Sequence, residues 1–85
     1  MNNQLNNLQT IPGVGEKIAQ EFLNIGIKKV SDLKGKDPNR LYEKICSEHG
    51  YPVDRCVLYI CRSSIYFAEN KNHDSEKLKW WNWKD

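Results

Sequence analysis

The chain has 85 residues, enough for one small domain, and it carries 13 basic and 11 acidic side chains for a net charge of +2. This mildly basic balance permits contact with nucleic acid through a local patch but excludes a histone-like basic tail. No apolar run approaches the roughly 18 residues of a membrane span, and the first residues lack the basic and apolar regions of a signal peptide. We therefore expect a cytoplasmic protein with no membrane partner, in which three cysteines stay reduced: Cys46, Cys56 and Cys61.

The first predicted helix is short and ends near Thr10. Leu5, Leu8 and Ile11 recur at a spacing of three, which is typical of a short amphipathic helix. Pro12 ends the pattern, because the residue before a proline avoids the helical region of backbone space.

A glycine-containing turn follows at residues 11–15, with the sequence Ile-Pro-Gly-Val-Gly, and a second helix is predicted at residues 15–24. An apolar stripe indicates that this helix has one buried face, formed by Ile18, Ala19, Phe22 and Leu23. Gly26 stands where a helix-ending glycine is expected, and Ile27 follows as its usual apolar contact.

The middle of the chain predicts one helical turn and one longer helix. Val30 and Leu33 mark a short helical turn that would pack on the same core. Asp37 followed by Pro38 is typical of a helix start, with an acidic N-cap and a proline at the first helical position. This third helix should end near Gly50.

The longest helix is expected at residues 53–69. Asp74 or Ser75 would then cap a last short helix that carries Leu78 and the three tryptophans. No stretch shows sustained strand alternation. We therefore expect an all-α fold of about five helices in a single domain, with residues 70–85 as a Trp-rich extension packed on or near the rest.

The turn at residues 11–15 offers the most specific chemistry in the chain. Gly13 and Gly15 have no Cβ, so they tolerate positive φ and let another backbone approach closely. The result would be a nest of outward-pointing amides at a helix N-terminus, which suits a phosphate oxygen. Lys17, in the first turn, would add a charge-assisted contact. A plain packing corner between two helices explains the same local pattern, so the turn alone leaves both interpretations open.

Residues 8–33 resemble the helix-hairpin-helix motif, which grips the DNA backbone in repair, recombination and replication proteins without reading bases. The matching positions are Leu8, Ile11, Pro12, Gly13, Val14, Gly15, Lys17, Ala19, Phe22, Leu23, Gly26, Ile27, Val30, Asp32 and Leu33. This resemblance implies a compact helix-hairpin-helix (SAM-like) bundle. It also implies that the phosphate ligands are the amides of Gly13, Val14 and Gly15, with Lys17 in support.

The downstream sequence is similar to a small bacterial family of helix-hairpin-helix proteins, the pathogenicity locus family. The likeness lies in residues 41–44, 50–59 and 78–85, of which the last reads Leu-Lys-Trp-Trp-Asn-Trp-Lys-Asp. The family implies this fold and an association with DNA, but no established activity. We therefore expect a non-enzymatic, sequence-independent module that binds the DNA backbone and needs no cofactor.

The chain departs from tandem helix-hairpin-helix domains, which usually carry two glycine hairpins that both grip DNA. The second position is taken by residues 49–53, His-Gly-Tyr-Pro-Val, which hold one glycine, and Pro52 removes an amide donor. Contact would then fall to side chains such as Tyr51 and Arg55. One intact hairpin predicts weak, salt-sensitive binding, with a Kd at or above the weak end of roughly 10⁻⁴ to 10⁻⁶ M.

Basic side chains around the short third segment are candidates for auxiliary contacts. Lys28 and Lys29 lead this cluster, and its other members are Lys34, Lys36 and Arg40. An ordinary solvated surface explains the same residues equally simply.

The cysteines and His49 suggest a metal site only in part. Cys46 and His49 have a spacing acceptable for half of a zinc site. Cys56 and Cys61 are five residues apart on a predicted helix, an awkward separation for joint ligation, and Cys56 lies on its apolar stripe. We therefore expect neither a metal nor a catalytic cysteine.

The tail carries Trp80, Trp81 and Trp83, which could stack on bases, close the core or meet a protein partner. We expect at least one to pack under the longest helix and another to stay exposed. The small net charge and the degenerate second hairpin support an alternative function. In that alternative the same fold is a protein–protein interaction module with little DNA affinity, and the tail binds a partner or a second copy.

Overall fold

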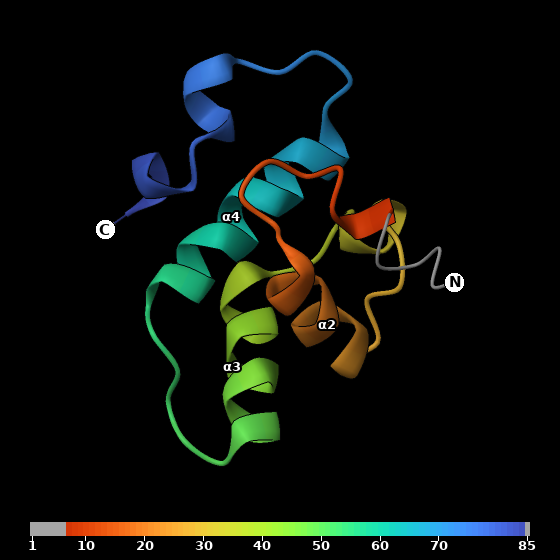
Figure 1. The fold of residues 1–85 in the computed structure, drawn as a ribbon. Helices are drawn as coiled ribbons and strands as arrows, with labels where there is room; N and C mark the ends of the chain where they lie inside the picture. The colour runs from red at the N-terminus through yellow and green to blue at the C-terminus, as the bar shows by residue number, and fades with distance from the viewer. Residues whose placement is uncertain (1–6, 85) are drawn as a thin grey trace.

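The computed structural model describes residues 7–84, and within this range the chain forms helices and no strand. The three α-helices are α2 (Glu16–Asn24), α3 (Pro38–His49) and α4 (Cys56–Glu69). The three 3₁₀ helices are η1 (Val30–Leu33), η2 (Ser75–Leu78) and η3 (Trp80–Trp83) (Figure 1). The predicted all-α single domain is confirmed, but the expected five helices are wrong, because the described residues hold three complete α-helices besides the helical residues Asn7 and Leu8.

The start of the first predicted helix lies outside the described residues. At its end, Asn7 and Leu8 are helical, and the Thr10 amide donates to the carbonyl of Asn7 at 3.3 Å. Leu8 is fully buried, which agrees with its predicted apolar role.

The last predicted helix is broken into η2 and η3. Within it, side chains take the carbonyls that a continuous helix would need for its own amides. Asn82 Nδ2 donates to the carbonyl of Glu76 at 2.7 Å, and Trp83 Nε1 donates to the carbonyl of Lys77 at 2.7 Å. Lys79, between the two segments, has an extended backbone.

Helix α2 begins and ends where the sequence predicts. Its C-terminus closes in a Schellman arrangement, in which Gly26 has a φ of +92°. The Gly26 amide donates to Leu23 O at 3.1 Å, and the Ile27 amide donates to Phe22 O at 2.9 Å. Helix α3 likewise begins where the sequence predicts, at Pro38.

The cap of α3 is made by Asp37, whose Oδ1 accepts from the Asn39 amide at 2.9 Å. Pro38 occupies the first helical position, and Gly50 ends the helix with a φ of +78°. These contacts are local in sequence, which is why the residue pattern predicts them.

Helix α4 begins three residues later than predicted, at Cys56 instead of residue 53. Asp54 explains the shift, because its Oδ1 accepts from the Cys56 amide at 2.9 Å and its carbonyl accepts from the Val57 amide at 3.0 Å. The bond to the Cys56 amide also holds the pKa of the Asp54 carboxyl below its usual range.

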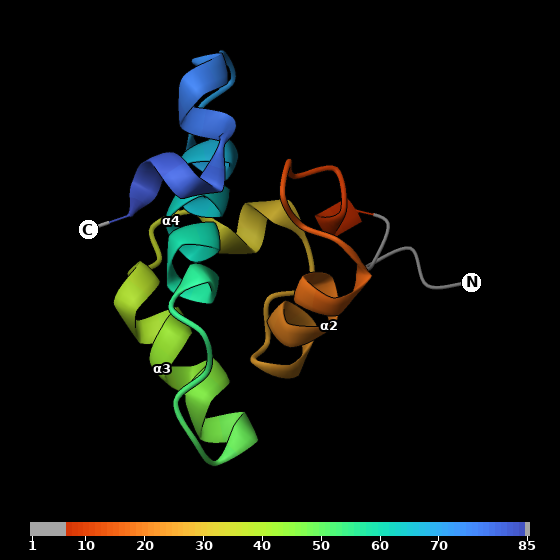
Figure 2. The same cartoon turned by 60° about the vertical axis from the view of Figure 1, so that its left-hand side comes forward.

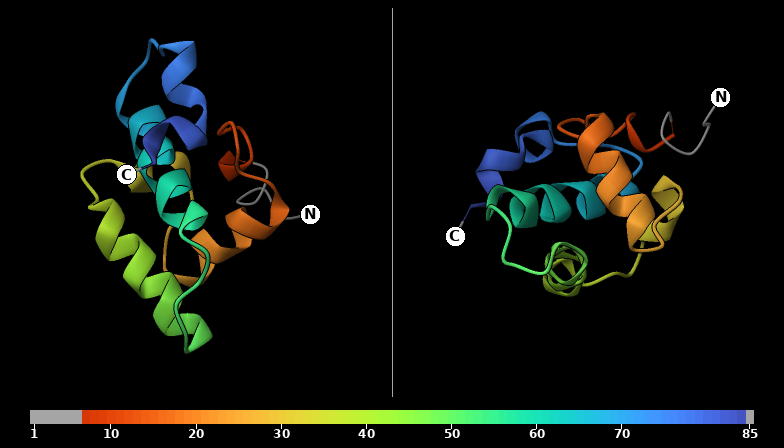
Figure 3. Two further views of the ribbon diagram at one scale, coloured as in Figure 1. Left: turned by 90° about the vertical axis from the view of Figure 1, so that its left-hand side faces the viewer. Right: turned by 60° about the horizontal axis from the view of Figure 1, so that its bottom comes forward.

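Helix α4 runs through the middle of the molecule. It packs against α3 and η1, and η2 and η3 pack along it as well. The right panel of Figure 3 shows α3 on one side of α4 and the C-terminal segment on the other, and Figure 2 shows α2 beside α4. The most buried side chains of this core include Leu8, Ile11, Ala19, Phe22, Leu33, Leu41, Ile45 and Cys61. No helix between residues 7 and 84 is long and apolar enough to cross a membrane.

Candidate nucleic-acid interface

The hairpin at residues 11–15 is a closed β-turn. The Val14 amide donates to the carbonyl of Ile11 at 3.0 Å, and Gly13 has a φ of +89°. Pro12 at the second position and a positive-φ glycine at the third are the residues that a type II turn requires. Ile11 and Val14 are buried and fix the turn to the core, so the backbone between them faces outward.

Helix α2 starts directly after this turn with an open first turn. Gly15 is its N-cap, with an extended backbone and no side chain to occupy the first amides. A Cβ on Gly15 would meet nothing within 4 Å. The amides of Glu16 and Lys17 precede the first intrahelical hydrogen bond, which runs from the Ala19 amide to Gly15 O at 2.9 Å. The helix end is therefore exposed and offers unpaired donors.

The three implied phosphate ligands differ in what their amides do. The Val14 amide is committed to Ile11, so Val14 contributes by closing the turn. The amides of Gly13 and Gly15 donate to no backbone carbonyl within residues 7–84. Among the three, the amides of Gly13 and Gly15 therefore remain available as donors, together with those of the first residues of α2.

The C-terminal segment lies against this hairpin, a contact that the sequence did not predict. A Cβ built on Gly13 would stand 3.1 Å from Cδ1 of Trp80, so the indole ring covers one side of the turn. Trp80 is half-buried and packs against the core, whereas Trp81 remains 50% exposed. Residues so far apart in the chain give no local pattern from which such a contact can be predicted.

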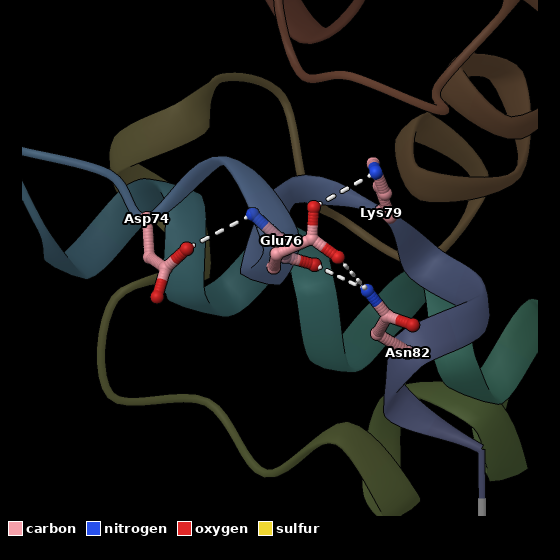
Figure 4. Close-up of polar contacts among 4 residues, drawn as sticks. All are labelled: Asp74, Glu76, Lys79 and Asn82. Atoms are coloured by element: carbon pink, nitrogen blue, oxygen red, sulfur yellow. Dashed lines mark hydrogen bonds and ion pairs between the residues drawn. The ribbon is translucent and has the colours of Figure 1, made fainter.

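The C-terminal segment is held together by polar contacts around Glu76 (Figure 4). The Glu76 amide donates to Oδ1 of Asp74 at 2.9 Å, and Lys79 Nζ lies 2.9 Å from Glu76 Oε2. The hydrogen bond from Lys79 lowers the pKa of Glu76. These contacts define the conformation from which Trp80 reaches the hairpin.

A groove of about 480 Å³ lies between α2 and the loop that joins α3 to α4. Lys17 and Tyr51 both line it, so the structure brings these two predicted site residues together. Tyr51 is 60% exposed, and its ring centre lies 5.5 Å from that of His49. His49 Nε2 in turn lies 2.6 Å from Glu21 Oε2 and ties the end of α3 to α2.

Two of the other auxiliary candidates, Lys28 and Lys29, lie elsewhere. Lys28 and Lys29 follow α2 at its C-terminal end, about a helix length from the hairpin at its N-terminus. Arg55 precedes α4, and its guanidinium lies 5.9 Å from the centre of the Tyr59 ring. The structure therefore does not gather Lys28 and Lys29 with Lys17.

Acidic side chains also lie at the site. Glu16 occupies the first turn of α2, and Glu21 and Asp54 line the same groove as Lys17. The Asp54 carboxylate is engaged by the Cys56 amide, and Glu21 is engaged by His49. The local charge is therefore mixed, and the unpaired amides at the start of α2 are the other groups here that favour an anion.

The cysteines and His49 do not assemble into a metal centre. Cys46 Sγ accepts from the Val53 amide at 3.5 Å, and Cys61 is fully buried in α4. Within residues 7–84 no group of three or more histidine, cysteine or acidic side chains is placed to hold a metal ion. Burial raises the pKa of the Cys61 thiol to about 12, and burial followed by the nearby Asp54 raises that of Cys56. Neither shift favours a reactive thiolate.

Comparison with known proteins identifies the chain's family. The chain matches the Cdd1 pathogenicity locus family over residues 1–85, and it belongs to that family. It is also similar to the mitomycin resistance protein McrB of Streptomyces lavendulae, with 36% identity over 62 residues. That alignment covers 73% of this chain and 59% of the relative. No solved structure matches the chain.

Proposed function

We propose that this member of the pathogenicity locus family is a non-enzymatic helix-hairpin-helix module that binds the DNA backbone without reading base sequence. The observation that carries the proposal is the open first turn of α2, preceded by a closed type II turn and a bare Gly15. Unpaired amides and the positive end of the helix dipole both favour a phosphate oxygen there. Phosphate contacts carry no base information, so the module does not select sequences.

The helix-hairpin-helix interpretation of the segment before α2 is supported by its burial pattern. Leu8, Ile11 and Val14 are at most 5% exposed, so they fix both arms of the hairpin to one core. The residues between them are turned toward solvent, as a backbone-gripping hairpin requires. The groove shared by Lys17 and Tyr51 gives the DNA a second point of contact through side chains.

The mixed charge of the site sets the expected strength of binding. Lys17 adds one cation, whereas Glu16 and Glu21 oppose a phosphate in the same region. Few phosphate contacts mean a small release of counterions and a Kd near the weak end of roughly 10⁻⁴ to 10⁻⁶ M. Binding should therefore be measured at low salt.

Lys17→Ala tests the proposal against Lys44→Ala, a matched exposed lysine that lines a different hollow on α3. We expect Lys17→Ala to weaken binding to a fluorescent duplex and to reduce the slope of log K against log salt by about one. Lys44→Ala should leave both quantities unchanged. Equal effects of the two variants, or no binding by the unaltered chain at low salt, would contradict the proposal.

A second candidate function is a protein–protein interaction module, favoured by the exposed indole of Trp81. Trp81 is 50% exposed, and its ring centre lies 5.7 Å from that of Trp80 in an edge-to-face arrangement. It therefore presents an apolar surface that is held against Trp80. Light scattering of the chain and of Trp81→Ser would separate the two functions. Self-association that Trp81→Ser abolishes, together with DNA binding that is absent, would favour this candidate.

A further inference from the structure

We propose that Trp80 is a positioning residue for the hairpin, holding residues 11–15 in the conformation that presents the first turn of α2. The expected effect of Trp80 on DNA binding rests on the proposed function, whereas the contact between Trp80 and the hairpin does not depend on that function. Trp80 belongs to the C-terminal segment, which follows α4 in the chain, while the hairpin precedes α2. The two ends of the domain therefore meet at the candidate site.

The contact is close and directional. A Cβ on Gly13 would lie 3.1 Å from Trp80 Cδ1, 3.9 Å from Cγ and 4.0 Å from Cβ. Gly13 is thus required both by its φ of +89° and by the nearness of the ring. On the other side of the hairpin, Gly15 faces open space. Because the ring lies against Gly13 and leaves Gly15 open, it supports the hairpin without covering the N-cap of α2.

The ring is presented by a segment that is itself anchored on α4. Arg62 Nη1 donates to the Trp83 carbonyl at 2.7 Å, and the Trp83 ring lies 5.8 Å from that of Tyr66. Trp83 Nε1 also donates to Lys77 O at 2.7 Å. The right panel of Figure 3 shows this segment and the loop before α2 on the same side of α4. Helix α4 therefore fixes the position of Trp80.

The hairpin has little else to fix its outer side. One backbone hydrogen bond closes it, from Val14 to Ile11, and these two side chains anchor its inner side. Removing the indole would expose the turn and let it open more often. A site that must order its donors on binding loses affinity relative to a preorganised one.

A double-mutant cycle tests the contact without DNA. Gly13→Ala should destabilise the domain, but its effect on the unfolding equilibrium constant should shrink about twofold to tenfold when Trp80 is already alanine. Gly26→Ala is the matched control, because Gly26 has a φ of +92° and open space around its Cβ position. Gly26→Ala should change the unfolding equilibrium constant by the same factor with or without Trp80. Additive effects at both glycines would overturn the proposed packing.

Amide exchange and DNA binding test the positioning role. In Trp80→Ala, exchange at the Val14 amide should quicken several-fold relative to the Ile27 amide, and duplex binding should weaken. Trp80→Phe should recover both, and Lys84→Ala, a change at an exposed residue of the same segment, should alter neither. Unchanged or tighter DNA binding by Trp80→Ala, with faster Val14 exchange, would overturn the role. If the unaltered chain binds no DNA, the proposed function fails, while the cycle and the exchange still decide whether Trp80 holds the hairpin.

Discussion

Gly15 is the residue at which stability and function are most clearly separable. Its backbone is extended and its Cβ position is open, so a larger residue fits without strain. In Gly15→Asp, the new carboxylate would cap the first amides of α2, which stabilises the domain by a few tenths of a kcal/mol. The same carboxylate would occupy the candidate phosphate site and repel an anion.

We therefore expect Gly15→Asp to unfold at an equal or higher denaturant concentration and to lose DNA binding. Gly15→Asn is the matched neutral change, and it should bind more weakly than the unaltered chain but better than Gly15→Asp. Denaturation curves and anisotropy titrations on the three proteins check this. Full binding by Gly15→Asp would remove the first turn of α2 from the site.

Cys61 makes a separate prediction about pH. Burial raises the folded-state pKa of its thiol to about 12, whereas the pKa of a cysteine thiol in an unfolded chain is about 8.5. The unfolded chain therefore loses this proton first, and the stability that the neutral thiol contributes is lost as pH rises above about 8.5. The free energy of unfolding should fall by up to about 1.4 kcal/mol per pH unit in this range from Cys61 alone. Cys61→Ala should reduce that slope in urea titrations under reducing conditions, and an unchanged slope would refute the assignment.

At the scale of elements, α3 depends on its cap. Asp37 accepts from the Asn39 amide, and Pro38 follows at the first helical position. Asp37→Ala should cost about 1 kcal/mol of stability, while Asp37→Asn keeps an acceptor and should cost less. Urea denaturation of both variants measures this difference. Equal losses would mean that the charge, and not the hydrogen bond, stabilises the helix start.

The same scale shows which elements the sequence predicts. Capping at Asp37 and Gly26 depends on residues within one turn of each other, so local patterns identify those helix ends. The predicted start of α4 is too early, because the apolar stripe alone would begin the helix at residue 53. In the structure the Asp54 side chain instead accepts from the Cys56 amide, where the helix begins. The prediction of one continuous last helix is wrong for a related reason. The side chains of Asn82 and Trp83 donate to carbonyls of the preceding turn.

For the whole molecule, the sequence predicts the all-α class and the family, but not how distant segments meet. The hairpin and its exposed helix end are local, and the turn of Pro12 and Gly13 has the predicted form. The contact of Trp80 with Gly13 joins segments with no local pattern in common. So does the pairing of Glu21 with His49, which ties the end of α3 to α2 beside the groove. Long-range packing therefore decides the support of the candidate site, whereas the nearness of Glu21 to Lys17 is local, because these residues are four apart on α2.

The domain is also arranged so that its candidate site depends on its C-terminus. Helix α4 packs against α3 on one side and carries η2 and η3 on the other. Through Trp80, the last segment of the chain supports a hairpin near the first. A change that displaces Trp80 should therefore alter the hairpin even where the changed residue touches no DNA.

An amide-resolved NMR titration of the ¹⁵N-labelled chain with a short duplex at low salt tests the central claim most directly. We predict that the largest shifts occur at the amides of Gly15, Glu16 and Lys17, that Tyr51 follows with smaller shifts, and that added salt reverses them. Shifts confined to Trp81 and its neighbours, or no shifts at the hairpin at any duplex concentration, would contradict the claim that this helix end binds the DNA backbone.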